Sequence, residues 1–209
     1  MPSLTIHLLA AYKYNPRGST EFFVGSLAPD AVSDRADKDR THMRDIPVSE
    51  RPAALAALAL RLDLSRDLEF GILLHLYTDY MWDTTLQKRY IETFGPGWFL
   101  PYREHIGIAG AWIYHHDPEI ERIWKEVADA VSGDLKIAVC DAVCGAYNLE
   151  CDKKRYAECG DVKSLILYNY HYNKDNDIGS SSAFPPGDVD RFAADTAAAF
   201  MEFLHRVVK

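Results

Sequence analysis

The sequence predicts an all-α protein, a single-domain multi-helix bundle over residues 1–209. The clearest periodic segment repeats its apolar positions one helical turn apart, at Leu68, Ile72, Leu76 and Tyr80. No segment sustains the alternation of apolar and polar residues that half-buried strands show. The 209 residues, 48% of them hydrophobic, are enough to bury one sizeable core. These three observations together favour helices packed on helices.

The first part of the chain alternates apolar segments with strong breaks. Residues 4–13 are apolar enough to begin a helix, and Pro16-Arg17-Gly18 ends it. Residues 22–27 form a second apolar segment that ends at Ala28-Pro29-Asp30. Because residues 33–46 are strongly charged, we expect a long loop there.

The middle of the chain holds the helix that we expect to be most buried. An Ala- and Leu-rich helix over residues 53–62 precedes it. Ser65 can cap the next helix, which we expect over residues 66–90. This helix is apolar nearly all round from Phe70 to Trp82, so it should lie at the centre of the bundle.

Gly95-Pro96-Gly97 separates that helix from the last part of the chain. Pro118 suits the first position of a helix, and residues 162–172 are apolar and aromatic. A polar segment over residues 174–187 should be a loop. The further helices that we expect cover residues 102–114, 118–131, 135–149 and 189–208.

Charge and composition exclude several classes of function. The net charge of −8 repels a phosphate backbone, so a protein that coats nucleic acid is disfavoured. No segment approaches the ~20 apolar residues needed to cross a bilayer, and the N-terminus lacks the pattern of a signal peptide. We therefore expect a cytoplasmic protein.

Four cysteines cluster in the second half of the chain, at Cys140, Cys144, Cys151 and Cys159. A reducing cytosol argues against a disulfide framework. A second zinc site is less favoured than buried thiols, because no C-x-x-C spacing occurs.

His75 and Asp79 carry the most informative spacing. They stand four residues apart in the central helix, so both side chains lie on one face and can reach one cation. A buried ionised Asp is costly unless it is paired or bound to a metal. The alternative is a His–Asp hydrogen bond or ion pair within the core.

Three further residues supply candidate ligands from the N-terminal third. His7 lies in the first expected helix, Asp30 follows Pro29 at a change of direction, and His42 lies in the charged segment. Alone, each has a structural explanation: a core histidine, a turn aspartate and a surface histidine. Together with His75 and Asp79 they form a nitrogen and oxygen set that suits zinc, and also manganese or iron. Five ligands exceed one tetrahedral zinc, so two adjacent metals that share a carboxylate are expected.

This ordered set resembles the bacterial zinc-dependent phospholipase C family, which is related to the single-strand-specific zinc nucleases. The resemblance covers residues 1–85 and rests on His7, Gly-Ser-Leu-Ala-Pro-Asp30, Thr-His42 and Gly-Ile-Leu-Leu-His75-Leu-Tyr-Thr-Asp79. It implies an all-α fold and a trinuclear zinc site that hydrolyses phosphodiesters. One zinc would be held by Asp30, His42, His75 and Asp79. Asp79 would bridge to a second zinc that also takes His7.

The chain departs from the family in two places. The secreted members place a mature N-terminal Trp on one metal, whereas Met1-Pro2 stands here. For the remaining zinc they use a further His and a His-x-x-x-Glu pair. The resemblance transfers these roles to His105, His115 and Glu119, although Pro118 interrupts a helix between the last two. The alternative is that His115-His116-Asp117 is a surface turn.

These residues predict a hydrolase of phosphoesters or phospholipids that uses a metal-activated water. Asp30 is the candidate acid or base, and Arg40 and Arg44 can hold a phosphate unless they are solvated loop charges. Aromatic residues can wall a substrate pocket, although such residues are more often core: Tyr77, Tyr80, Trp82, Trp112 and the run Tyr168 to Tyr172.

Two other interpretations stay open. One is an HD-type metal phosphohydrolase built on His75, His116-Asp117 and a later residue such as Asp175, which leaves Asp30, His42 and Asp79 unexplained. The other is a protein whose metal site is structural, or one that binds a ligand without turnover.

Overall fold

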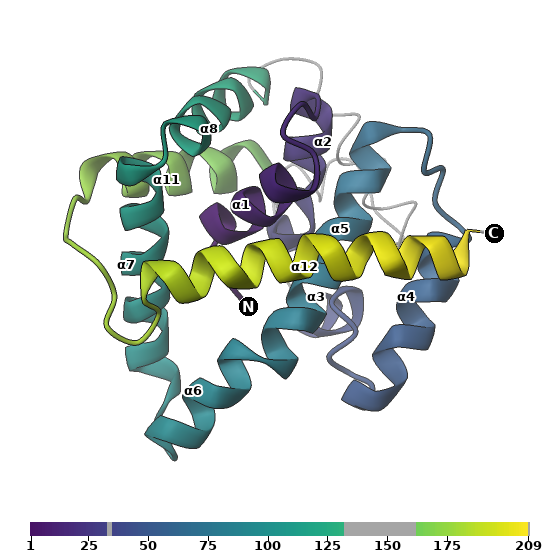
Figure 1. The fold of residues 1–209 in the computed structure, drawn as a ribbon, viewed down its shortest axis with the longest axis horizontal. Coiled ribbons are helices and arrows are strands. Elements are labelled where there is room, and N and C mark those ends of the chain that lie inside the picture. Colours follow the sequence, from purple (N-terminus) through teal and green to yellow (C-terminus); the bar gives the residue numbers. More distant parts are fainter. Residues whose placement is uncertain (33–34, 132–161, 209) are drawn as a thin grey trace.

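The structure, a computed structural model, describes residues 1–32, 35–131 and 162–208 (Figure 1). Within these ranges the regular elements are helices and no strand occurs, which confirms the all-α class. The elements are α1 (Leu4–Tyr14), α2 (Thr20–Gly25), η1 (Ala28–Ala31), α3 (Arg35–Thr41), η2 (Val48–Glu50), α4 (Arg51–Ala59), α5 (Asp67–Thr84), α6 (Leu86–Phe94), α7 (Phe99–His116), α8 (Pro118–Ala130), α11 (Val162–Asp175) and α12 (Pro186–Val207).

The prediction of a long loop over residues 33–46 is wrong, because α3 occupies Arg35–Thr41. Arg35 pairs with Asp39 one turn later, and Arg40 pairs with Asp37. Oppositely charged side chains at these spacings stabilise a helix. The charges that suggested a loop are therefore the surface of a short helix.

The single helix expected over residues 66–90 is divided into α5 and α6 at Thr85. Thr85 has φ −121° and ψ −91°, outside the helical region. Its hydroxyl donates to the Met81 carbonyl at 2.6 Å, and the Thr84 hydroxyl donates to the Tyr80 carbonyl at 2.9 Å. Such local bonds compete with the helical pattern of the backbone. The helix expected over residues 135–149 and all four cysteines lie outside the described residues.

Helix α5 is the central element. Its residues from Gly71 to Asp79 are buried without interruption, as the sequence predicts. Helix α2 packs along α5, and α1 packs along α12, which runs across the face seen in Figure 1. Among the described residues, no helix combines the length and the hydrophobicity that crossing a bilayer requires.

Two glycines set how closely α2 and α5 approach. A Cβ added to Gly71 would overlap the carbonyl oxygen of Phe22, and one added to Gly25 would overlap that of Leu68. Only glycine leaves room for backbones this close. The contact brings the residue after α2, Ser26, against the middle of α5.

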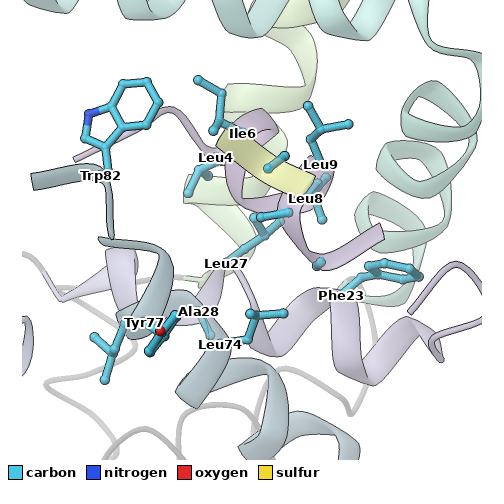
Figure 2. Close-up of a cluster of buried hydrophobic side chains, with 14 of the residues drawn as sticks. Leu4, Ile6, Leu8, Leu9, Phe23, Leu27, Ala28, Leu74, Tyr77 and Trp82 are labelled. Carbon is cyan, nitrogen blue, oxygen red and sulfur yellow. The ribbon is translucent and has the colours of Figure 1, made fainter. Parts of the chain in front are cut away.

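The core extends through most of the helices, and its part around α1, α2 and α5 includes the residues labelled in Figure 2: Leu4, Ile6, Leu8, Leu9, Phe23, Leu27, Ala28, Leu74, Tyr77 and Trp82. Ile6 and Leu8 are fully buried on either side of His7 in the sequence. His7 itself is 1% exposed. A polar ring therefore stands within the hydrophobic core, and its chemistry needs an explanation.

Candidate metal centre

The structure brings together five of the predicted ligands in one buried cluster: His7, Asp30, His42, His75 and Asp79. They come from α1, η1, the residue after α3, and two successive turns of α5. Their side chains are between 0% and 7% exposed. Segments distant in sequence thus converge on one point of the core.

Helices α5 and α1 supply one half of this cluster. His75 and Asp79 stack one turn apart on α5, with Nε2 and Oδ2 separated by 3.8 Å. The His7 ring lies flat on the His75 ring, with centroids 3.9 Å apart and planes 9° from parallel. His7 Nε2 lies 3.6 Å from Asp79 Oδ1.

The other half of the cluster comes from η1 and the end of α3. Lys38 of α3 holds Asp30 in place, with Nζ 3.0 Å from Oδ1 and 3.3 Å from the backbone carbonyl. His42 follows α3 directly and places Nε2 3.5 Å from Asp30 Oδ1 and 3.6 Å from Asp79 Oδ2. The side chain of Asp30 is 7% exposed, and that of His42 is fully buried.

Hydrogen bonds to backbone carbonyls determine the tautomers of two histidines. His75 Nδ1 lies 2.8 Å from the Ser26 carbonyl, and His42 Nδ1 lies 2.9 Å from the Lys38 carbonyl. A carbonyl oxygen only accepts, so each Nδ1 donates its hydrogen. In the neutral rings, Nε2 then carries a lone pair that points into the cluster.

The two Nε2 atoms lie 3.3 Å apart. Burial, with His7 beside the ring, lowers the pKa of His75 to about 3, so this imidazole is neutral near neutral pH. Two lone pairs that face each other at this distance repel. The arrangement is stable when a cation lies between them, and backbone carbonyls that orient ligating imidazoles in this way are typical of metal sites.

The Asp79 carboxylate lacks hydrogen-bond partners. Both carboxylate oxygens are buried, and neither has a hydrogen-bond partner within the described part of the chain; both His7 ring nitrogens share this condition. Burial alone would raise the pKa of Asp79, but His7 and Arg44 outweigh it and hold that pKa well below its usual range. Asp79 is therefore an ionised and buried group that needs positive charge close by.

The spacing of these atoms fits a small cation. A tetrahedral ion with ligands at about 2.0–2.1 Å separates neighbouring ligand atoms by about 3.3–3.4 Å. The separations here run from 3.3 Å to 3.8 Å. Two groups of three ligands have atoms within 4.8 Å of one another: His7, His75 and Asp79, and Asp30, His42 and His75.

These two groups share His75, whereas the family resemblance makes Asp79 the shared ligand. The position of Asp79 is nevertheless suited to bridging. Its Oδ1 faces His7, while its Oδ2 faces His42 and His75. One carboxylate thus addresses both halves of the cluster.

The structure does not bring His105, His115 and Glu119 into this cluster or into another ligand group among the described residues. His105 pairs with Tyr90, its Nδ1 lying 3.0 Å from the hydroxyl oxygen. His115 lies about 15 Å further along the same helix, α7, and is exposed. Glu119 pairs with Arg122 at 3.0 Å.

The reason lies between α7 and α8. His115 ends one helix and Glu119 begins the next, so the four-residue spacing does not stack them as it stacks His75 and Asp79. Between them, Asp117 has extended backbone and caps α8 by accepting from the Glu119 N–H at 3.0 Å. The surface turn is the interpretation that this geometry supports.

Sequence reasoning missed the groups that surround the ligands. Lys38 lies in the segment expected to be a loop, so its distance from Asp30 could not be foreseen. Asp83 could have been found from the sequence, because it stands one turn after Asp79 on α5. It binds Arg44 through both oxygens at 3.1 Å and Arg51 at 2.8 Å.

Comparisons of this chain with protein-family models, with curated proteins and with solved structures found no match.

Proposed function

We propose that the cluster binds one or two divalent metal ions, zinc first, and that the chain uses them to hydrolyse phosphoesters on a scaffold like that of zinc-dependent phospholipase C. One observation carries the proposal. The Nε2 atoms of His42 and His75 converge on the carboxylate of Asp79, which accepts no hydrogen bond from the described residues, in a fully buried site. The likeness in order and spacing to the family supports the step from metal to phosphoester.

A hydrogen-bonded core does not account for this geometry. A His–Asp hydrogen bond needs an N–H that points at the carboxylate from about 2.7–3.2 Å. The Nδ1 hydrogens of His42 and His75 point instead at backbone carbonyls. The distances from His Nε2 to the Asp79 oxygens are 3.6 Å or more. Ligand atoms that surround an ion are expected to sit at such separations.

The donor set also favours zinc over the harder cations. Three of the five ligands are imidazoles, which suit zinc and which magnesium and calcium rarely bind, and zinc also accepts carboxylate oxygens. When bound, zinc would activate a water molecule and polarise a phosphoryl oxygen.

Asp30 is the chain's own candidate for proton transfer. Burial would raise its pKa, but His42 and Lys38 hold the pKa of this carboxyl well below its usual range. It is ionised near neutral pH, so it can accept a proton but has none to donate. Lys38, 3.0 Å away, is placed to stabilise that charge.

A non-catalytic metal-binding protein is the second candidate. It is favoured by the separation of His105, His115 and Glu119, which leaves the third zinc of the family without a gathered ligand set among the described residues. The HD-type alternative fits less well. It pairs the fully buried His75 with His116, which is exposed and whose Nδ1 donates to the Trp112 carbonyl at 2.9 Å.

The test is zinc content together with turnover. The purified chain is loaded with zinc, desalted and analysed for metal by mass spectrometry, then assayed on a chromogenic phosphodiester and the matching monoester. We expect stoichiometric zinc and turnover of at least one ester. The variant Asp30→Asn removes a ligand oxygen and the candidate base together, so it should lower both zinc content and turnover.

Zinc without turnover of either ester would favour the non-catalytic protein. Absence of bound zinc in the folded wild-type chain would contradict both candidates. Carbonic, carboxylic and phosphate esters in one panel would separate a phosphoesterase from other hydrolases.

A further inference from the structure

We propose that Arg44 forms an anion subsite beside the metal cluster that binds a non-reacting oxygen of a phosphoester or of free phosphate. This inference rests on the proposed metal site and adds to it the residue that selects an anionic substrate. The observations are the placement of Arg44, the anchoring of its side chain and the charge of its surroundings.

The backbone turns Arg44 toward the cluster. Met43, between His42 and Arg44, has φ 55°, and it is the one non-glycine residue with positive φ in the described chain. That conformation is uncommon for a long side chain and often marks a functional site. The Arg44 backbone N–H closes this turn by donating to the Asp39 carbonyl at 2.7 Å. His42 and Arg44, on either side of Met43, thereby face the same site.

Asp83 holds one edge of the Arg44 guanidinium. Its Nε and Nη2 each lie 3.1 Å from an oxygen of Asp83, and Nη2 also lies 3.9 Å from Asp79 Oδ2. A guanidinium has five N–H donors, and the Asp83 fork occupies two of them. The side chain is 20% exposed, and the proposed anion would bind the donors that remain.

Arg51 keeps this arrangement rigid. It lies 2.8 Å from Asp83, and its side chain is 9% exposed. Asp83 is therefore fixed between two arginines, and it orients Arg44 without neutralising both of them. A preoriented guanidinium loses little conformational entropy when it binds an oxyanion.

The side-chain charges near the cluster balance before any metal binds. Three carboxylates belong to Asp30, Asp79 and Asp83, and three cationic side chains face them: Lys38, Arg44 and Arg51. The N-terminal amine of Met1, 3.8 Å from Asp83 Oδ1, is a further cationic group on the same side of the balance. Each divalent ion then adds two positive charges that no described side chain at the cluster offsets. A buried excess of positive charge strongly favours an anionic ligand over a neutral one. This balance points to phosphates rather than to neutral esters.

Arg40, the other arginine of this segment, has a different position. It pairs with Asp37 at 2.9 Å, and its side chain is 44% exposed on the surface of α3. It serves as the matched control for Arg44, because it has the same chemistry four residues away.

The experiment is calorimetric titration of the zinc-loaded protein with inorganic phosphate, with zinc content measured on the same samples. We expect Arg44→Gln to keep its zinc and to bind phosphate about ten- to a hundredfold more weakly, since a charge-assisted contact is lost. Arg40→Gln should bind both as the wild type does. If Arg44→Gln does not fold, Arg44→Lys replaces it in the test, because it keeps the positive charge. Arg44→Lys should keep its zinc and bind phosphate several-fold more weakly than the wild type.

Wild-type phosphate affinity in a folded, zinc-loaded Arg44 variant would overturn the inference, as would a zinc-loaded wild type that binds no phosphate. Either outcome leaves the metal site itself standing. A wild type that binds no zinc would instead contradict the proposed function.

Discussion

Two parts of the molecule hold a histidine and a carboxylate four residues apart, and only one of them resembles a metal site. His75 and Asp79 lie within α5 and are 0% and 2% exposed. His115 and Glu119 also stand four residues apart, but both are exposed and a helix boundary separates them.

The two parts differ in whether water and interaction partners reach their polar side chains. At the end of α7, solvent and Arg122 satisfy the polar groups, so nothing requires an ion. In the core, Asp79 and His7 have four buried polar atoms without hydrogen bonds, as far as the structure describes their surroundings. A buried charge that lacks hydrogen bonds is costly, and a bound cation reduces that cost. The same residue types at the same spacing therefore indicate a metal site only where the side chains are buried.

The largest expected effect comes from changing one carboxylate of each pair to an amide. Asp79→Asn keeps the shape of the side chain and removes its charge and one ligand oxygen. We expect it to weaken zinc binding by about a hundredfold or more, beyond the loss typical of residues that only support a ligand. Competition with a chromophoric chelator measures the affinity.

Glu119→Gln is the matched control, and it should bind zinc as the wild type does. Equal losses in the two variants would remove the distinction between the two parts of the molecule.

Removal of the metal should have the next largest effect. Zinc at about a thousand times its dissociation constant stabilises the folded chain by about 4 kcal/mol. Chelation should then lower the melting temperature by about 8–16 °C for a chain of this length. Differential scanning calorimetry with and without chelator gives the value. In Asp79→Asn the same zinc concentration is only about ten times the dissociation constant, so the chelator should cost only about 1.4 kcal/mol. A wild-type curve that does not change with chelator would contradict a metal that is part of the fold.

A smaller effect is expected where α2 crosses α5. Gly71→Ala would force a Cβ against the Phe22 carbonyl and displace Ser26 from His75. We expect a loss of about 1–3 kcal/mol in the free energy of unfolding, together with weaker zinc binding. Urea denaturation and the chelator competition measure the two.

Gly187→Ala, in open space at the start of α12, is the control and should be neutral or slightly stabilising. If Gly71→Ala lost stability but kept full zinc affinity, the close crossing would not orient His75.

The smallest effect is predicted for the exposed histidine. His115→Ala should change the free energy of unfolding by less than about 0.5 kcal/mol and leave zinc affinity unchanged. Chemical denaturation resolves a difference of this size only as an upper limit. A clear loss of bound zinc would show that the exposed pair also holds a metal.

The sequence alone predicted the helical class, the buried central helix and the five residues that the structure gathers. These depend on strong local signals, such as the all-round apolar surface of α5 and the spacing of His75 and Asp79. Helix α3 was missed because its charges suit a solvated loop as well as a helix surface. The break at Thr85 depends on a hydroxyl that bonds backward to Met81, which an apolar pattern does not reveal.

The groups that surround the ligands could not be predicted from the sequence, for a different reason. The carbonyls of Ser26 and Lys38 that orient the imidazoles are backbone groups, and every residue has one. The Asp83 pairs with Arg44 and Arg51 join segments 39 and 32 residues apart, whose meeting only the packed fold determines.

Anomalous diffraction at the zinc absorption edge, from crystals of the zinc-loaded wild-type chain, tests the central claim most directly. We predict one or two strong peaks within ligand distance of His75 Nε2 and the Asp79 carboxylate, about 2.0–2.2 Å, and none beside His115 or Glu119. A folded chain with no peak in the buried cluster, or with zinc only at the exposed end of α7, would contradict the account.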